Sequence, residues 1–235
     1  MTWSTDDVAD LEAFTDEYVL ARLADLAKGG SPEFRADAAL RLGPALEWVD
    51  EELADDDLSW EVVKRARTAL RSIHDDQGEP ELVRRKALEA SVRYPEPWHA
   101  DAVRAALDRG GAWRITGVFC AGRYGGCDDD IRAACRSGDP DLILVGLAAA
   151  GSLEGFEDVG RIAVRLAADP ETSREMRLEV VSLLGNLRDD RGQVFKVLDD
   201  LSMDPDQELA EIAAEALSEY LLWERLAEEE EDFEL

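Results

Sequence analysis

The sequence predicts an all-α protein, built as a right-handed α-α superhelix (solenoid) of about six helix pairs. Seven segments share an apolar residue, a small or apolar residue four positions later, and usually further such residues at offsets five and eight. These offsets fall on one stripe of a helix with 3.6 residues per turn. In addition, no segment of useful length alternates apolar and polar residues as a strand would. The seven segments are 34–43, 62–71, 83–92, 113–122, 142–151, 176–185 and 209–218.

The spacing of the segments is typical of a repeated helix pair. Their starts lie 21 to 34 residues apart, a loose period near thirty. The 21-residue interval predicts that 58–76 and 80–94 are the two helices of one pair. A small residue at the centre of the stripe lets a neighbouring helix approach closely. The residues at offset four are Ala38, Ala66, Ala87, Gly117, Gly146, Val180 and Ala213.

Partner helices are expected between the segments, bounded by turns that contain proline or glycine. We expect a solenoid over residues 1–223, with an irregular acidic insertion at 44–60 and a glycine-rich turn at 122–130. The tail 224–235 is so acidic that it is expected to be disordered, or to serve as a short docking motif. The expected partner helices are 16–28, 98–109, 128–137, 156–168 and 191–203.

Composition limits the classes of function. The 235-residue chain has a formal net charge of −28, which disfavours binding to nucleic acid or to an anionic membrane. Its 3 cysteines suit a reducing cytoplasm, and the N-terminal residues show no signal-peptide pattern. The uncharged stretch 142–153 is too short to span a bilayer. We therefore expect a cytoplasmic protein that binds neither nucleic acid nor membranes.

The second helices carry an apolar residue followed by Arg and then Ala or Gly, clearest in VRRKALEASV, WRITGVFCAG and MRLEVVSLLG. This pattern resembles the HEAT-repeat proteins, specifically their phycobilisome-lyase-like subset, over residues 16–222. The resemblance implies an α-solenoid whose curved surface binds proteins. Because the lyases that give the subset its name act on bilins, it also leaves open a small-molecule role.

Arginine occupies offset one in four segments. The favoured interpretation is a structural ladder in which each guanidinium bridges to an acidic turn residue, with Asp57 and Asp108 as natural partners. The alternative is a row of binding groups on the concave face. The four arginines are Arg35, Arg84, Arg114 and Arg177.

Residues 61–127 carry a net charge of +3, whereas the flanking segments carry −12 and −19. The local excess of basic residues is either a solvated face or a docking patch for an acidic partner, which would be another protein or the acidic end of a second copy. If it is a docking patch, reversing Arg84, Arg85 and Lys86 to Glu should abolish association and leave the fold intact. The clusters comprise Lys64, Arg65, Arg67, Arg71, Arg84, Arg85 and Lys86.

A second candidate binding ridge lies at the ends of successive second helices. Trp, Tyr and Arg are the residue types enriched in binding hot spots, although Pro95 and Pro97 make a packed turn an equal alternative for Trp98. The ridge candidates are Arg93, Tyr94, Trp98, Arg123 and Tyr124.

The sequence predicts no enzyme, no metal site and no cofactor. Cys120, Cys127 and Cys135 lack the close pairs of a zinc site and are expected to be buried thiols. With only 2 histidines the chain has none of the His-Glu dipeptides that deoxyhypusine hydroxylase, an iron enzyme of HEAT-like repeats, requires. The favoured function is a non-enzymatic scaffold that binds a protein or peptide. The alternative is a bilin-lyase-like or other accessory protein that binds a small molecule in its groove.

Overall fold

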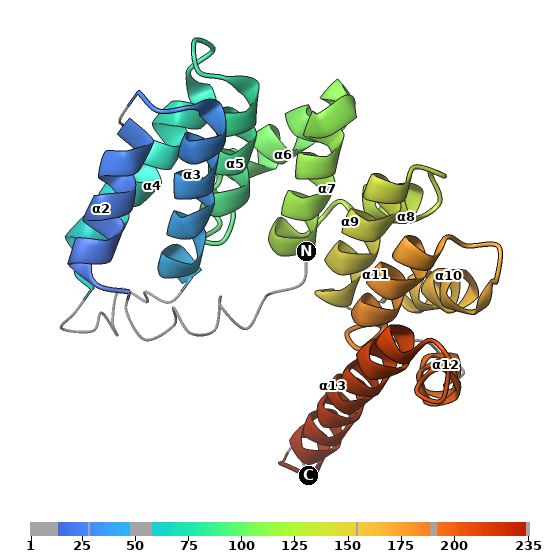
Figure 1. The fold of residues 1–235 in the computed structure, drawn as a ribbon. Helices are drawn as coiled ribbons and strands as arrows, with labels where there is room; N and C mark the ends of the chain where they lie inside the picture. The colour runs from blue at the N-terminus through green and yellow to red at the C-terminus, as the bar shows by residue number, and fades with distance from the viewer. Residues whose placement is uncertain (1–13, 28, 48–57, 154, 189–191, 234–235) are drawn as a thin grey trace. The chain divides into compact units, whose positions relative to one another are not determined.

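A computed structural model of the chain describes residues 14–27, 29–47, 58–153, 155–188 and 192–233 (Figure 1). Across these ranges the secondary structure is helical, with no strand, so the predicted all-α class is confirmed. The chain divides into two compact units, Met1–Tyr124 and Gly125–Leu235. The sequence instead predicts one continuous solenoid over 1–223. The division falls in the predicted glycine-rich turn, where Gly125 and Gly126 have φ of +81° and +73°, a backbone conformation that favours glycine.

The described part of the first unit consists of three helix pairs. Within each pair the consecutive helices pack against each other, and the second helices α3, α5 and α7 also pack side by side. The first helices α2 and α4 are likewise in contact. The pairs are α2 (Asp16–Ala27) with α3 (Pro32–Glu47), α4 (Trp60–Asp75) with α5 (Glu81–Ser91), and α6 (Trp98–Arg109) with α7 (Gly111–Tyr124).

The second unit repeats this plan in its described residues. Its second helices α9, α11 and α13 pack in sequence, and its first helices α8, α10 and α12 form the other layer. The six pairs across the described residues match the predicted number. The pairs here are α8 (Asp128–Cys135) with α9 (Pro140–Gly151), α10 (Glu157–Ala168) with α11 (Arg174–Leu184), and α12 (Gln193–Leu201) with α13 (Gln207–Phe233).

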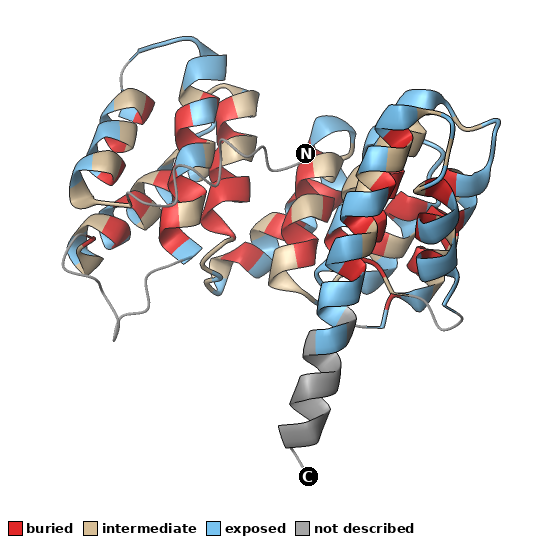
Figure 2. Cartoon of the chain, turned by 60° about the horizontal axis from the view of Figure 1, so that its bottom comes forward, coloured by how far each residue is buried: buried red, intermediate tan, exposed pale blue. Residues whose placement is uncertain are grey.

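The small residues at the centre of each stripe lie where helices approach closely. All seven offset-four residues are buried, and buried residues face the helix contacts within each unit (Figure 2). A Cβ atom on Gly146 would lie 2.8 Å from the Cys135 Sγ atom, and one on Gly117 would lie 2.8 Å from the Leu107 amide nitrogen. The predicted helix register is therefore confirmed at both positions.

Two expected irregular segments differ from the structure. Residues 44–47 of the predicted insertion continue α3, and Trp60 already begins α4, while 48–57 lie outside the described residues. The predicted disordered tail is helical as far as Phe233, because α13 continues through it. Glu, Leu and Ala are good helix formers, so an acidic composition does not by itself end a helix. No helix in the described part of the chain combines the length and the hydropathy needed to cross a bilayer.

Candidate functional site

Three of the four predicted ladder arginines make the same backbone hydrogen bond. The Nε atom of Arg35 donates to the Leu26 carbonyl oxygen at 2.9 Å, that of Arg84 to His74 at 2.9 Å, and that of Arg177 to Ala167 at 3.0 Å. Each arginine is the fourth residue of a second helix, and each acceptor is the penultimate residue of the preceding helix. Carbonyl groups in the last turn of a helix have no partner within that helix. The ladder is therefore structural, as favoured, but its shared acceptor is a backbone carbonyl.

Two of these arginines also reach an acidic turn residue of the next pair. Arg35 binds Glu79 through two hydrogen bonds of 2.6 and 2.8 Å, and Arg177 lies 3.9 Å from an Asp204 oxygen. The acidic partners predicted from the sequence, Asp57 and Asp108, are not the ones observed. Asp57 lies outside the described residues, and in the described structure Arg114 makes neither the carbonyl bond nor an ion pair with Asp108. Only Gly110 separates α6 from α7, so the turn is too short to offer Arg114 the same acceptor.

The predicted docking patch of Arg84, Arg85 and Lys86 lies against neighbouring helices, and none of the three is exposed. Arg84 is buried, and its guanidinium carbon lies 5.4 Å from the centre of the Trp113 ring. Arg85 donates to the Ala112 carbonyl oxygen at 3.0 Å. The residues are thus occupied by internal contacts. A helix face that looks basic in sequence is here used for packing.

Lys86 belongs to a polar network between α5 and α7. Its Nζ atom lies 2.6 Å from one carboxylate oxygen of the buried Glu89, and the Thr116 hydroxyl donates to the other at 2.6 Å. Each Glu89 oxygen therefore has a partner, which offsets the cost of removing the carboxylate from water.

Arg93 and Arg123, two of the ridge candidates, converge on one carboxylate. Glu47, the last residue of α3, lies 2.6 Å from Arg93 and 3.1 Å from Arg123. Gly43 makes room for Arg93, because a Cβ atom there would lie 2.8 Å from the Arg93 Cδ atom. Burial, and secondly repulsion from Arg123, lowers the pKa of Arg93. The structure thus brings together two of the five ridge candidates, Arg93 and Arg123, through Glu47.

Tyr94 and Trp98 lie in a separate stack. The guanidinium of Arg67 lies 3.9 Å from the centre of the Tyr94 ring and 5.3 Å from that of Trp60. Glu96 holds it with an ion pair of 2.7 Å and accepts a hydrogen bond from the Trp98 indole nitrogen at 3.2 Å. Trp98 is therefore part of a packed turn, as the alternative interpretation held.

Tyr124, the last ridge candidate, lies 6.4 Å from the His99 ring, which is fully buried. The Glu96 amide donates to His99 Nδ1 at 2.8 Å, so the neutral ring carries its proton on Nε2, 3.0 Å from the Ser91 hydroxyl. Ser91 in turn donates to the Leu88 carbonyl oxygen at 3.0 Å. Burial lowers the pKa of His99 to about 4, which keeps this chain of hydrogen bonds neutral.

Two of the three cysteines are buried thiols, as predicted. Cys120 and Cys135 are inaccessible, and burial raises the pKa of both, that of Cys135 to about 12. Thiols protonated in this way are poor nucleophiles. Cys127 is partly exposed and precedes α8 as its N-cap residue.

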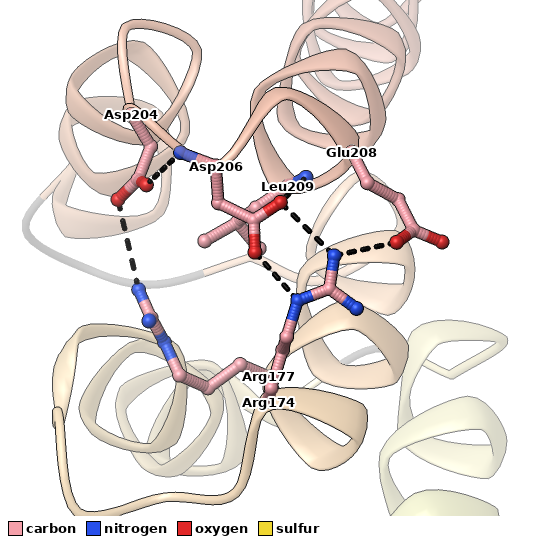
Figure 3. A network of polar contacts seen from close by, with 6 residues as sticks. All are labelled: Arg174, Arg177, Asp204, Asp206, Glu208 and Leu209. Atoms are coloured by element: carbon pink, nitrogen blue, oxygen red, sulfur yellow. Dashed lines mark hydrogen bonds and ion pairs between the residues drawn. The ribbon is translucent and has the colours of Figure 1, made fainter.

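The second unit places arginine–carboxylate contacts at its surface. Arg174 binds Asp206 and Glu208, and Arg177 approaches Asp204, so that the start of α11 is tied to the turn before α13 (Figure 3). Half of the Arg174 side chain is exposed. Such exposed pairs contribute little to stability.

The second unit also contains a cavity that sequence reasoning missed. Its volume is about 510 Å³, and it lies beside the C-terminal ends of α9 and α11 and the middle of α13. Trp223, which contributes to the wall, is 51% exposed. The lining residues are Ala150, Gly151, Leu153, Gly155, Phe156, Glu157, Asn186, Leu187, Arg188 and Trp223. The available signal was the apolar run Leu221–Leu222–Trp223, which directly precedes the acidic tail.

The cavity wall offers binding groups more than reactive ones. Phe156, Leu187 and Trp223 supply apolar surface, while Asn186 and Arg188 supply hydrogen-bond donors. Arg188 lies 4.6 Å from the centre of the Tyr220 ring and donates to the Leu187 carbonyl oxygen at 3.0 Å. Among the described residues, no cluster of three His, Cys, Asp or Glu side chains could hold a metal ion.

No protein-family model matches the chain, and a comparison with curated proteins gives no match. Human deoxyhypusine hydroxylase in complex with glycerol is similar in structure at 16% identity, over 87% of this chain and 96% of that chain, with a TM-score of 0.38. A designed armadillo repeat protein is similar at 14% identity, over 88% of this chain and 99% of that chain, with a TM-score of 0.41. Similarities at these levels carry no argument about function.

Proposed function

We propose that this chain is a non-enzymatic, HEAT-like interaction scaffold, and that the cavity beside Trp223 binds a peptide segment of a partner protein. The observation that carries the proposal is the half-exposed Trp223 side chain in the wall of a cavity of about 510 Å³. Large aromatic side chains are costly to leave in water, and an exposed one beside a concave surface marks a binding site.

The surroundings of Trp223 favour a peptide. Leu221 and Leu222 precede it and are 49% and 44% exposed, so this turn of α13 presents three large apolar side chains to solvent. An apolar side chain of a peptide would enter between Phe156 and Trp223. The Asn186 amide group can donate to a peptide carbonyl and accept from a peptide N–H group. The Arg188 guanidinium can donate to a second peptide carbonyl.

A small organic molecule is the second candidate ligand, and the cavity volume favours it. Ligand pockets have volumes of about 300–1,000 Å³, and this cavity falls within that range. Absorbance spectra of the purified protein would show a pigment that remains bound. A spectrum with only the protein band at 280 nm, together with peptide binding, would count against this candidate.

Panning a random peptide library against the whole chain tests the peptide proposal. Peptides that bind the wild type should bind Trp223→Ala at least about tenfold more weakly, because truncating a hot-spot residue costs about 2 kcal/mol or more. Met203→Ala is the matched control, since Met203 is 84% exposed and lies outside the cavity wall. Failure to enrich any peptide, or equal binding to Trp223→Ala and wild type, would refute the proposal.

A further inference from the structure

A second candidate site lies in the first unit, away from the residues of the cavity. The C-terminal ends of α3, α5 and α7 contribute Glu47, Arg93 and Arg123, and the two guanidinium groups bind opposite oxygens of the one carboxylate. We infer that Arg93 and Arg123 form a carboxylate-binding fork for an acidic segment of a partner protein, and that Glu47 occupies this fork as an internal substitute.

The fork is rigid on one side and open on the other. The Arg93 side chain is only 12% exposed, because its stem crosses α3 in the space that Gly43 leaves. In contrast, the Arg123 side chain is 28% exposed and that of Glu47 is 44% exposed. An incoming carboxylate can therefore reach Arg123 and replace Glu47 while Arg93 keeps its position.

Two arginines in such proximity repel each other. Arg123 helps to lower the pKa of Arg93, after burial. A carboxylate between two guanidinium groups relieves this repulsion and makes strong, charge-assisted hydrogen bonds to both. This arrangement favours a carboxylate ligand over a neutral one.

The fork holds Glu47 only weakly, because 44% of the Glu47 side chain is exposed and exposed ion pairs contribute little to stability. The ring of Phe119, 5.7 Å from the Arg123 guanidinium, adds an apolar surface next to the fork.

Binding of a fluorescein-labelled hexaglutamate peptide, followed by fluorescence anisotropy at 150 mM salt, tests the inference. Glu47→Gln removes the internal carboxylate and should bind the peptide about threefold to fivefold more tightly than the wild type, the range expected for an exposed ion pair. Arg123→Gln should weaken binding by at least a similar factor. Glu47 is exposed and Arg123 is partly exposed, and the folding of both variants is checked by circular dichroism.

Two variants on α4 provide matched charge controls. Glu61→Gln removes one exposed acid and Arg65→Gln one exposed base, both outside the fork. Each control should bind the peptide as the wild type does. The inference is wrong if Glu47→Gln binds no more tightly than Glu61→Gln, or if Arg123→Gln binds as well as Arg65→Gln. If the fork only stabilises the fold, all four variants should bind the peptide alike, and Glu47→Gln should have a lower melting temperature.

Discussion

Arg67 of the first unit and Arg174 of the second are bound in different ways. Arg67 lies between two aromatic rings and its side chain is 15% exposed. Arg174 binds two turn carboxylates and its side chain is 51% exposed. Each unit also contains the other kind of contact, since Arg132 of the second lies 4.3 Å from the centre of an aromatic ring and Arg41 of the first forms an exposed ion pair. An arginine of the more basic segment is thus internal, whereas one of the strongly acidic segment lies at the surface.

This difference shows that net charge along the sequence does not locate a charged surface. Arginine has a long apolar stem and a planar guanidinium that stacks on aromatic rings, so it can be buried where aromatic residues are available. The first unit has Trp60 on α4, Tyr94 after α5, Trp98 on α6 and Trp113 on α7, and an arginine lies over each ring. The local excess of basic residues at 61–127 thus reflects, in part, the composition of a packed interior.

The largest expected effect comes from reversing Arg84, Arg85 and Lys86 to Glu together. The sequence predicts that the fold survives, but the structure predicts that it is lost, because Arg84 is buried and Lys86 neutralises the buried Glu89. Breaking a buried pair costs about 3–5 kcal/mol. Urea unfolding followed by circular dichroism should show a loss of stability of at least that size.

The matched control for this reversal is the triple change of Lys64, Arg65 and Arg71 to Glu. All three lie on α4 and are exposed. The charge change is the same, so the loss of stability should be a small fraction of that of the internal triple. Similar losses for both triples would mean that net charge, and not internal contact, sets the stability of the first unit.

Close helix packing is common to both units. Gly117→Leu in the first unit and Gly146→Leu in the second should each cost about 2–3 kcal/mol or more, because each side chain would meet a helix within 3 Å. Cys127→Ser should be neutral or slightly stabilising, since serine is a better N-cap. The thermal midpoints of the three variants measure these changes in stability. A midpoint for Cys127→Ser as low as those of the glycine variants would contradict the helix register.

The loss of stability between pH 7.5 and pH 5 should be largest in the first unit, which contains both histidines of the chain. Burial lowers the pKa of His74, and that of His99 to about 4, whereas an unfolded histidine titrates near 6.5. The unfolded chain therefore binds more protons, so the stability from His99 is complete above pH 6.5 and is lost as the pH falls towards 4. Between pH 7.5 and pH 5 the loss amounts to about 2 kcal/mol.

Urea unfolding at these two pH values measures that loss. In His99→Gln, which does not titrate, the difference between the two pH values should shrink by about 2 kcal/mol. A variant that keeps the full difference would show that groups other than His99 cause the acid sensitivity.

The smallest effect is expected at the surface of the second unit. Arg174→Ala removes the contacts with Asp206 and Glu208, but these groups are well solvated and salt screens them. Its thermal midpoint should stay close to that of the wild type at physiological salt. A large decrease would show that the exposed network of Figure 3 supports the turn before α13.

The helices and their register followed from the sequence because burial imposes a period that is visible in the residues. The expected helix 98–109 agrees with α6, and the expected small residues are buried. The division at Gly125 was less predictable, because the repeat pattern continues on both sides of the turn. The sequence does not predict the helical extension to Phe233, because a dense run of acidic residues is typical of disorder.

The candidate sites were predictable only in part. The positions of Arg93 and Arg123 at the ends of second helices predicted only a common ridge, and Glu47 could not be foreseen, since it is 46 and 76 residues away from them. The cavity beside Trp223 depends on residues from α9, the start of α10, α13 and the segments that follow α9 and α11. Whether Trp223 is exposed is decided by how these elements pack, and no local pattern encodes that.

The hydrogen bond from the Nε atom of the ladder arginines to a backbone carbonyl also limits how the repeats can vary in length. It joins the penultimate residue of one helix to the fourth residue of the next, over nine residues for Arg35 and ten for Arg84 and Arg177. Lengthening the intervening turn, for example between Ala168 and Arg174, would move the guanidinium out of reach and leave a carbonyl without a partner. Insertions and deletions in related chains should therefore avoid these three turns and collect in the connections between pairs.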